Sequence, residues 1–307
     1  MAVLKQLKWR PQVKSVAFGS GPVRHEFLPY LLTAPVLICG GIVLLMPLGV
    51  QLYYSFMARE RGTLAYYIGT RATLDNYVQI ITRSDLVGSM LWSFGVGFVV
   101  AIGIIALGLP VAHFLARGKG IGKTLVEMSL LLPLFGDIYL AFALMYAFAP
   151  QGIVNWALRG LGLIHDPILL MSTPIAAIIA MLLPSTSVLL VESALVGIEP
   201  VYEEAALTLG ASPLRAWLST TLALARTGLV GAFLLTFSGA IGAFTIPAVL
   251  AGTSNPWIST QIANISQDRN IPLGSALAIV LMTVSLATIY AYLRLTEQRF
   301  EVHRNGS

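Results

Sequence analysis

The chain has 307 residues, of which 56% are hydrophobic and 11% are charged, and its formal net charge is +5. A soluble globular domain carries roughly 25% charged residues, so a chain this poor in charge cannot cover a water-facing surface. Lipid is the apolar medium that fits, and the composition therefore predicts an integral membrane protein in contact with the lipid bilayer. Basic and aromatic residues do not interleave, so we expect no nucleic-acid partner.

The N-terminal region lacks the features of a cleaved signal peptide. Residues 1–27 are too polar, and no small-residue cleavage site follows them. We therefore expect an N-terminal arm over residues 1–27, followed by a first apolar run that stays in the protein as a helix. The single cysteine, Cys39, lies in that run and predicts neither an internal disulfide nor a metal site.

Six apolar runs are long enough to cross a membrane. A helix needs about 20 apolar residues to span a hydrocarbon core of about 30 Å. The runs cover residues 28–53, 86–115, 125–148, 170–190, 229–250 and 273–293. Backbone groups in lipid must be hydrogen-bonded within the chain, so each run is expected to be a helix. The prediction is an all-α polytopic membrane protein with about six transmembrane helices, a transmembrane domain over residues 28–293 and a tail over 294–307.

Positively charged side chains indicate the orientation. Cytoplasmic loops carry an excess of Lys and Arg. With six spans, the arm, the loops after the second and fourth spans, and the tail lie on one side. These segments hold Lys5, Lys8, Arg10, Lys14, Arg24, Arg117, Lys119, Lys123, Arg215, Arg226, Arg294, Arg299 and Arg304. The opposite side holds Arg59, Arg61, Arg71, Arg83, Arg159 and Arg269. The bias predicts both termini in the cytoplasm.

Two segments on the outer side are expected to form short helices. Residues 73–81 have Thr73 or Asp75 as a candidate N-cap. Residues 151–163 carry glycines near both ends. Structured outer segments of this kind offer a surface to a partner on that side.

The loop between the fourth and fifth spans predicts two short helices joined by a bend. Pro200 suits a first helical turn because its missing N–H has no partner there in any case. Glu203 and Glu204, with Glu199, lie near that N-terminus, where the helix dipole favours anions. Gly210 is placed to end the helix in a left-handed cap, and Ser212-Pro213 restarts a helix.

The bend also carries a face of small residues, namely Ala205, Ala206, Gly210 and Ala211. Small residues let another protein approach closely, and the neighbouring carboxylates can pair with basic residues of that protein. From the residues alone, a well-capped interfacial helix between two spans explains the loop equally well.

Ionisable groups at membrane depth are costly, by about 3 kcal/mol at a helix centre, and they face a cavity or a partner. Asp137 lies near the middle of the third predicted span, so it is protonated, paired within the bundle or exposed to a pathway. Glu127, Glu192 and His113 lie near span ends and are interpreted as structural or interfacial. The fifth span carries residues that allow close helix contact or free a backbone carbonyl. These are Gly239, Gly242, Phe244, Thr245 and Pro247, and ordinary close packing remains the alternative.

The segment Glu204-Ala205-Ala206, followed after three residues by Gly210, is similar to the cytoplasmic signature of binding-protein-dependent ABC importer permeases. The Ile, Leu and Pro that continue the signature correspond here to Thr220, Leu222 and Ala223, so only the Leu matches. Other segments resemble the same family in order along the chain. They are residues 73–77, 108–110, 115–117, Gly152 to Asn155, and 270–276.

The resemblance implies that this chain works together with several other subunits, each with its own role. Glu204, Ala205, Ala206 and Gly210, with Glu203 as a helper, would form a coupling helix that docks on an ABC ATPase dimer. That dimer would bind ATP and Mg, because the sequence has no Walker A loop. This chain would carry no catalytic residue, metal or cofactor. It would pair with a second permease subunit, a related chain, and work by alternating access in the inner membrane.

The resemblance also assigns the other candidate residues. The fifth span would line the pore. Asp137 is a pathway candidate because of its place in the third predicted span and not through the resemblance. Four outer residues would contact a solute-binding protein: Gly152, Asn155, Asn270 and Pro272. Residues 244–252 most resemble spermidine/putrescine-type permeases, a branch that includes iron, opine and phosphonate importers. A polyamine-like cation is therefore the expected solute. A secondary transporter, which requires its own ion site and usually inverted repeats, and a membrane scaffold are the rival interpretations.

Overall fold

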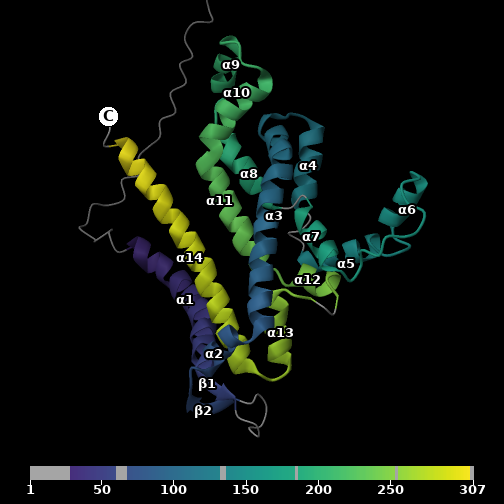
Figure 1. Ribbon diagram of the computed structural model, residues 1–307. Coiled ribbons are helices and arrows are strands. Elements are labelled where there is room, and N and C mark those ends of the chain that lie inside the picture. The colour runs from purple at the N-terminus through teal and green to yellow at the C-terminus, as the bar shows by residue number, and fades with distance from the viewer. Residues whose placement is uncertain (1–27, 60–67, 132–135, 184–185, 253–254, 305–307) are drawn as a thin grey trace, which may run out of the picture. The chain divides into compact units, whose positions relative to one another are not determined.

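The computed structural model describes residues 28–59, 68–131, 136–183, 186–252 and 255–304 (Figure 1). The chain forms two compact units, residues 1–49 and 50–307. The described part is helical apart from one short β-hairpin, as the all-α prediction requires. The predicted N-terminal arm, residues 1–27, lies outside the described residues.

The first helix, α1 (Leu28–Ser55), matches the first predicted span. Its segment Thr33–Ser55 has a mean hydropathy of 2.1, which suits a helix that spans a bilayer. Pro35 and Pro47 lie inside α1.

Three long helices form the centre of the second unit. α3 (Ser84–Arg117), α8 (Thr186–Val196) and α11 (Thr221–Gly242) pack against one another. Small residues permit this packing. A Cβ added at Gly228 of α11 would lie 2.6 Å from the Cβ of Ala194 on α8, so only glycine fits that crossing.

α3 connects three apolar clusters along its length. Leu86 packs with residues of α2 (Asp75–Thr82), α13 (Ile258–Gln267) and α14 (Ile271–Arg304). Its middle packs with α7 (Pro174–Leu182), α12 (Thr245–Leu250) and the fully buried Trp257. Its last turns, including Leu115, pack with α8 and α11. Because α3 contributes to all three clusters, it contacts most of the other helices of the second unit.

A hairpin and a short helix follow α1. Strand β1 (Met57–Arg59) pairs antiparallel with β2 (Ile68–Ala72). The buried amide of Asn76 donates to the carbonyls of Ser55 and Met57, each at 2.9 Å, and so fixes α2 on the hairpin. The predicted short helix is confirmed, but its N-cap is Leu74. The Thr73 hydroxyl instead accepts a bond from the Asp75 N–H at 3.1 Å.

The described residues contain five helices long and apolar enough to cross a membrane: Thr33–Ser55, Ser84–Arg117, Pro174–Val196, Thr221–Gly242 and Ile271–Tyr290. The third predicted span, 125–148, is wrong as a single continuous helix. α4 (Ile121–Leu131) and α5 (Asp137–Ala147) lie on either side of residues outside the described ranges. Gly136, directly before α5, has φ of 121°, which no α-helix accommodates.

Two further boundaries differ from those predicted. The fifth predicted span is interrupted at Ala243 and Phe244, between α11 and α12. The last helix, α14, continues to Arg304, so position 294 marks no change of secondary structure. The second predicted outer helix is α6 (Ile153–Gly160).

Candidate functional site

The bend between α9 (Val201–Thr208) and α10 (Pro213–Ser219) has the predicted glycine cap. Gly210 has φ of 88°, a conformation that costs any other residue strain. Its N–H donates to the Leu207 carbonyl at 2.9 Å, and the Ala211 N–H donates to the Ala206 carbonyl at 3.1 Å. This pair of bonds is the Schellman motif, which ends α9 and turns the chain sharply at Gly210.

Local chemistry also sets both helix starts. The carbonyl of Pro200 accepts from the N–H groups of Glu203 and Glu204, each at 3.0 Å. Ser212 is extended and Pro213 is the first residue of α10, as predicted, although the Ser212 hydroxyl makes no capping bond. The two carboxylates lie in the first turn of α9, where the helix dipole stabilises them.

α9 has no buried residue and presents an open surface. Glu204 and Ala205 are exposed, and Leu209 at its end is 90% exposed. A side chain at Gly210 would meet nothing within 4 Å. α9 and α10 extend beyond the end of α11 (Figure 1). The geometry therefore offers a rigid, small-residue projection to something outside the described chain.

Glu203 differs from its neighbours because it is partly buried and bonded within the chain. Its carboxylate accepts a hydrogen bond at 3.1 Å from the hydroxyl of Thr221, the buried first residue of α11. Trp217 of α10 makes a second connection, donating from Nε1 to Nδ1 of His113 on α3 at 3.1 Å. The projection is thus tied to both α11 and α3. Sequence reasoning missed these contacts, which join residues 18 and 104 positions apart.

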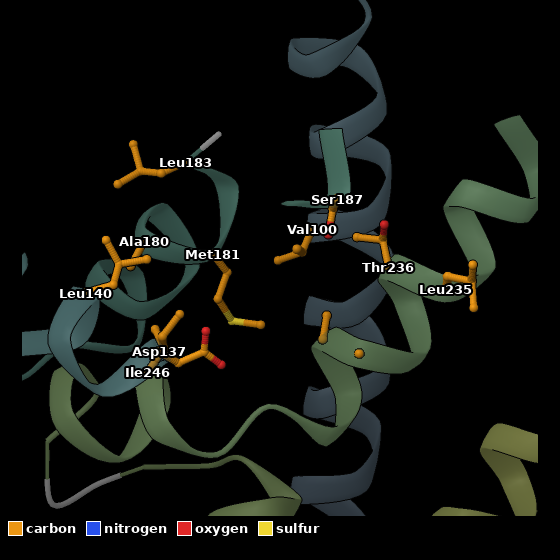
Figure 2. A pocket seen from close by; sticks show the side chains of 12 residues that line it. Val100, Asp137, Leu140, Ala180, Met181, Leu183, Ser187, Leu235, Thr236 and Ile246 are labelled. Carbon is orange, nitrogen blue, oxygen red and sulfur yellow. The ribbon is translucent and has the colours of Figure 1, made fainter. Parts of the chain in front are cut away.

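A cavity of about 210 Å³ lies between the central helices and α5, α7 and α12 (Figure 2). Its lining residues are Val100, Asp137, Leu140, Ala180, Met181, Leu183, Ser187, Leu235, Thr236, Gly239, Ala240 and Ile246. Asp137 is the first residue of α5, and its carboxylate points into the cavity. The structure thereby brings Asp137 and Gly239, both predicted pathway residues, to one site.

Two residues that carry hydroxyl groups also line the cavity. Ser187 belongs to α8 and Thr236 to α11, on the wall opposite Asp137 (Figure 2). Thr236 is only 7% exposed, and its hydroxyl has no hydrogen-bond partner among the described residues. The remaining lining is apolar. Sequence reasoning missed both hydroxyls, because Ser and Thr are common inside transmembrane helices and give no distinct signal.

Four predicted pathway residues are not among those that line this cavity, namely Gly242, Phe244, Thr245 and Pro247. A Cβ at Gly239 or Gly242 would meet nothing within 4 Å, so close helix packing does not explain either glycine among the described residues. Phe244 and Thr245 form the junction into α12, and Phe244 is 47% exposed. Pro247 is buried and lacks the N–H that would reach the Ala243 carbonyl, which accepts instead from the Ser259 hydroxyl at 2.5 Å.

The four residues predicted to contact a binding protein differ in their surroundings. Asn155 is 1% exposed. Its amide donates to the carbonyls of Ala149 and Ile168 at 3.0 and 3.1 Å and accepts from the Ile168 N–H at 2.7 Å. A Cβ at Gly152 would lie 2.3 Å from two carbonyl oxygens. Pro272 is buried, and Asn270 is partly exposed. Asn155 and Pro272 are therefore buried within the described chain, whereas Asn270 is partly accessible.

A known protein family matches most of the chain. The family described as "Binding-protein-dependent transport system inner membrane component" matches residues 101–301. This range includes α4 to α13, and therefore the projection and every residue that lines the cavity except Val100.

Curated relatives agree with that family. The spermidine/putrescine transport system permease protein PotB of Escherichia coli (strain K12) is 29% identical over 269 residues, covering 84% of this chain and 95% of the relative. The protein of the same name from Haemophilus influenzae is 26% identical and covers 81% and 87%. The molybdenum transport system permease protein ModB of Mycobacterium bovis is 27% identical and covers 72% and 83%.

Solved structures show the same fold. A bacterial ABC transporter involved in the import of the acidic polysaccharide alginate contains a chain with a TM-score of 0.70 and 17% identity, covering 89% of this chain and 96% of that one. The alginate transporter in complex with an alginate pentasaccharide-bound periplasmic protein gives a TM-score of 0.71 at 18% identity. The chain is a multi-pass permease component of an ABC importer and is not itself catalytic. It belongs to the family of binding-protein-dependent transport system inner membrane components.

Proposed function

We propose that this permease forms one half of the translocation pathway for a small, polyamine-like cation and that α9 couples it to an ABC ATPase dimer. The observation that carries the proposal is the rigid projection of α9 and α10. Ala205 and Gly210 are exposed on it, Ala206 and Ala211 are half-buried, and side chains of α9 and α10 are bonded to α11 and α3.

The projection has the properties of a mechanical link. Glu204, Ala205, Ala206 and Gly210 form the docking face, and a groove of the ATPase subunit is the partner that fits. Glu203 acts inward, through Thr221, so that movement of the docked helix is passed to α11. α11 lines the cavity that contains Asp137. Closure of the ATPase dimer on ATP would thus change the shape of the pathway.

The remaining subunits follow from this arrangement. A second permease subunit, a related chain, completes the pore, and α1 presents an apolar surface suited to it or to lipid. A solute-binding protein delivers the solute at the outer side, near the hairpin, α2 and Asn270. If α9 contacts the ATPase, both termini are cytoplasmic, because six spans place the termini and α9 on one side.

The solute assignment has two sources of support. PotB proteins, which are spermidine/putrescine permeases by name, resemble this chain over more than four fifths of its length. The carboxylate of Asp137 in the cavity favours a cation. The resemblance to the molybdenum permease ModB keeps an anionic solute as the specific alternative. Iron, opine or phosphonate import would be tested in the same assay.

Reconstitution tests the proposal. The permease is purified with its ATPase, its partner permease and its binding protein, and uptake of labelled putrescine and spermidine into proteoliposomes is measured with and without ATP. Ala205→Glu places a charge and extra volume on the docking face. It is expected to abolish ATP-dependent uptake and to release the ATPase during purification.

Gln79→Glu provides the matched control, because it adds the same charge to an exposed position of α2, far along the chain from α9. It should leave ATPase association intact. Uptake driven by an ion gradient without ATP would instead identify a secondary transporter. A chain that purifies alone and stimulates no ATPase would support a scaffold.

A further inference from the structure

We propose that Ser259 is a positioning residue for transport, because its hydroxyl holds the interruption between α11 and α12, where one wall of the cavity joins the other. The inference deepens the proposed function and rests on it for the assignment of the cavity to the translocation pathway. One wall consists of α3, α8 and α11, and the other of α5, α7 and α12 (Figure 2). The chain passes from the first wall to the second at Ala243 and Phe244.

The carbonyl of Ala243 lacks its usual helical partner. In a continuous helix this carbonyl would accept from the N–H of residue 247, four positions further on, but Pro247 has no N–H. The Ser259 hydroxyl, from α13, donates to the carbonyl at 2.5 Å, although the two residues lie 16 positions apart. Within a membrane domain an unpaired carbonyl is costly. The hydroxyl of Ser259 therefore replaces the N–H that the proline removes.

A second bond acts one turn further along α12. The buried side-chain amide of Asn255 donates to the carbonyl of Pro247 at 2.6 Å. The oxygen of the same amide accepts from the Trp257 N–H at 3.0 Å and from the Thr260 hydroxyl at 2.9 Å, which fixes its orientation. The segment from Asn255 to Ser259 therefore holds the chain at two carbonyls that are four positions apart.

The start of α13 is also bonded to the first wall. The N–H of Ile258 donates to the hydroxyl of Ser93 on α3 at 2.9 Å, and both residues are buried. α12 packs against α5 and α7 of the second wall. The start of α13 thus connects the two walls. Loss of the Ser259 bond should let the second wall move more freely against the first, which would change access to the cavity between them.

Access to the cavity can be measured directly. Leu140→Cys places a thiol on α5 among the residues that line the cavity, in a chain whose own cysteine is removed by Cys39→Ser. This reference chain is assembled with the ATPase, the partner permease and the binding protein in nanodiscs, which leave both membrane faces accessible. The rate at which a charged thiol reagent modifies position 140 is measured without nucleotide and after trapping with ATP and vanadate.

Two variants of α13 are compared in the reference chain. Ser259→Ala removes the donor to the Ala243 carbonyl. Ser266→Ala is the matched control, because that hydroxyl also belongs to α13 but bonds to the Ile262 carbonyl of its own helix at 2.8 Å. Ser259→Ala should raise the modification rate without nucleotide about threefold to tenfold, which is the effect of one hydrogen bond on an equilibrium. Ser266→Ala should leave the rate unchanged.

Two rescue experiments distinguish the hydrogen bond from packing. Ser259→Thr keeps a hydroxyl and should restore the rate of the reference chain. Pro247→Ala supplies an N–H four positions after the Ala243 carbonyl, so that a backbone donor is again available to it. In the Pro247→Ala background, Ser259→Ala should therefore have a smaller effect than it has in the reference chain.

Two results would overturn the inference. A modification rate for Ser259→Ala equal to that of the reference chain would show that the bond does not hold the walls. An equal rise with Ser266→Ala, or a rise that neither Ser259→Thr nor Pro247→Ala reduces, would assign the effect to the packing of α13. A reference chain whose rate does not respond to ATP and vanadate would instead refute the proposed function, because the rate without nucleotide tests the Ser259 bond by itself.

Discussion

Removal of the Thr221 hydroxyl should loosen the connection between α9 and α11. Thr221 is 1% exposed, and its Oγ1 lies 3.1 Å from Oε2 of Glu203. Thr221→Val keeps the branched shape of the side chain and deletes the donor. A hydrogen bond to a charged group contributes about 1.5–3 kcal/mol. Glu203 is partly exposed, so water can replace the lost donor in part, and we expect a loss of about 1 kcal/mol.

A double-mutant cycle isolates this contact from other effects of the substitution. Thr221→Val, Glu203→Ala and the double variant are compared by thermal unfolding of the purified importer. Their interaction energy should be about 1 kcal/mol, because the second substitution removes a bond that the first has already broken. In the control cycle Glu199→Ala replaces Glu203→Ala, since Glu199 is exposed and no hydrogen bond joins it to Thr221 within the described chain. That cycle should be additive within about 0.5 kcal/mol.

The functional consequence is measured as solute imported per ATP hydrolysed. A looser connection should let α9 move with the ATPase while α11 follows less completely. Thr221→Val is therefore expected to retain ATPase activity and to import less solute for each ATP. Additive stabilities in the Glu203 cycle, together with an unchanged ratio of solute to ATP, would refute the idea that this bond transmits movement.

Two further predictions concern the bend and the outer loop. Gly210→Ala should destabilise the turn by about 1 kcal/mol and weaken ATPase association, because alanine is strained at φ of 88° although nothing obstructs its Cβ; unchanged co-purification with the ATPase would contradict this. Asn155→Ala removes three hydrogen bonds from a buried side chain and should lower stability by about 2–4 kcal/mol in thermal unfolding; a loss below about 0.5 kcal/mol would show that water or a rearranged loop replaces the amide.

Features that depend on neighbouring residues could be predicted from the sequence. The left-handed turn at Gly210 and the restart of the chain at Pro213 follow from local backbone chemistry, and both are present. The long apolar helices could be predicted from the hydropathy of the sequence. The break before Asp137 was missed because hydropathy averages over a window, so Gly136 appeared as one small residue in an apolar segment. Its φ of 121° became evident only in the structure.

Features that depend on contacts between distant residues could not be predicted. Glu203 was expected only to assist Glu204 in docking, yet its carboxylate accepts a hydrogen bond from Thr221, whereas Glu204 is exposed. His113 was expected at the interface, and its contact with Trp217, which donates to it, could not be seen in the sequence. Thr236 resembles every other helical threonine in sequence. Its buried hydroxyl has no hydrogen-bond partner within the described chain, and no sequence pattern reports such an absence.

Photo-cross-linking from α9 tests the central claim most directly. A photoreactive phenylalanine analogue replaces Ala205 in one chain and Ile81, exposed on α2, in a control chain. Each is assembled in membranes with the ATPase, the partner permease and the binding protein. Our account predicts that position 205 cross-links to the ATPase subunit, that the yield changes on addition of ATP, and that position 81 never reaches it. Cross-linking of position 205 to lipid or to the binding protein alone would contradict the account.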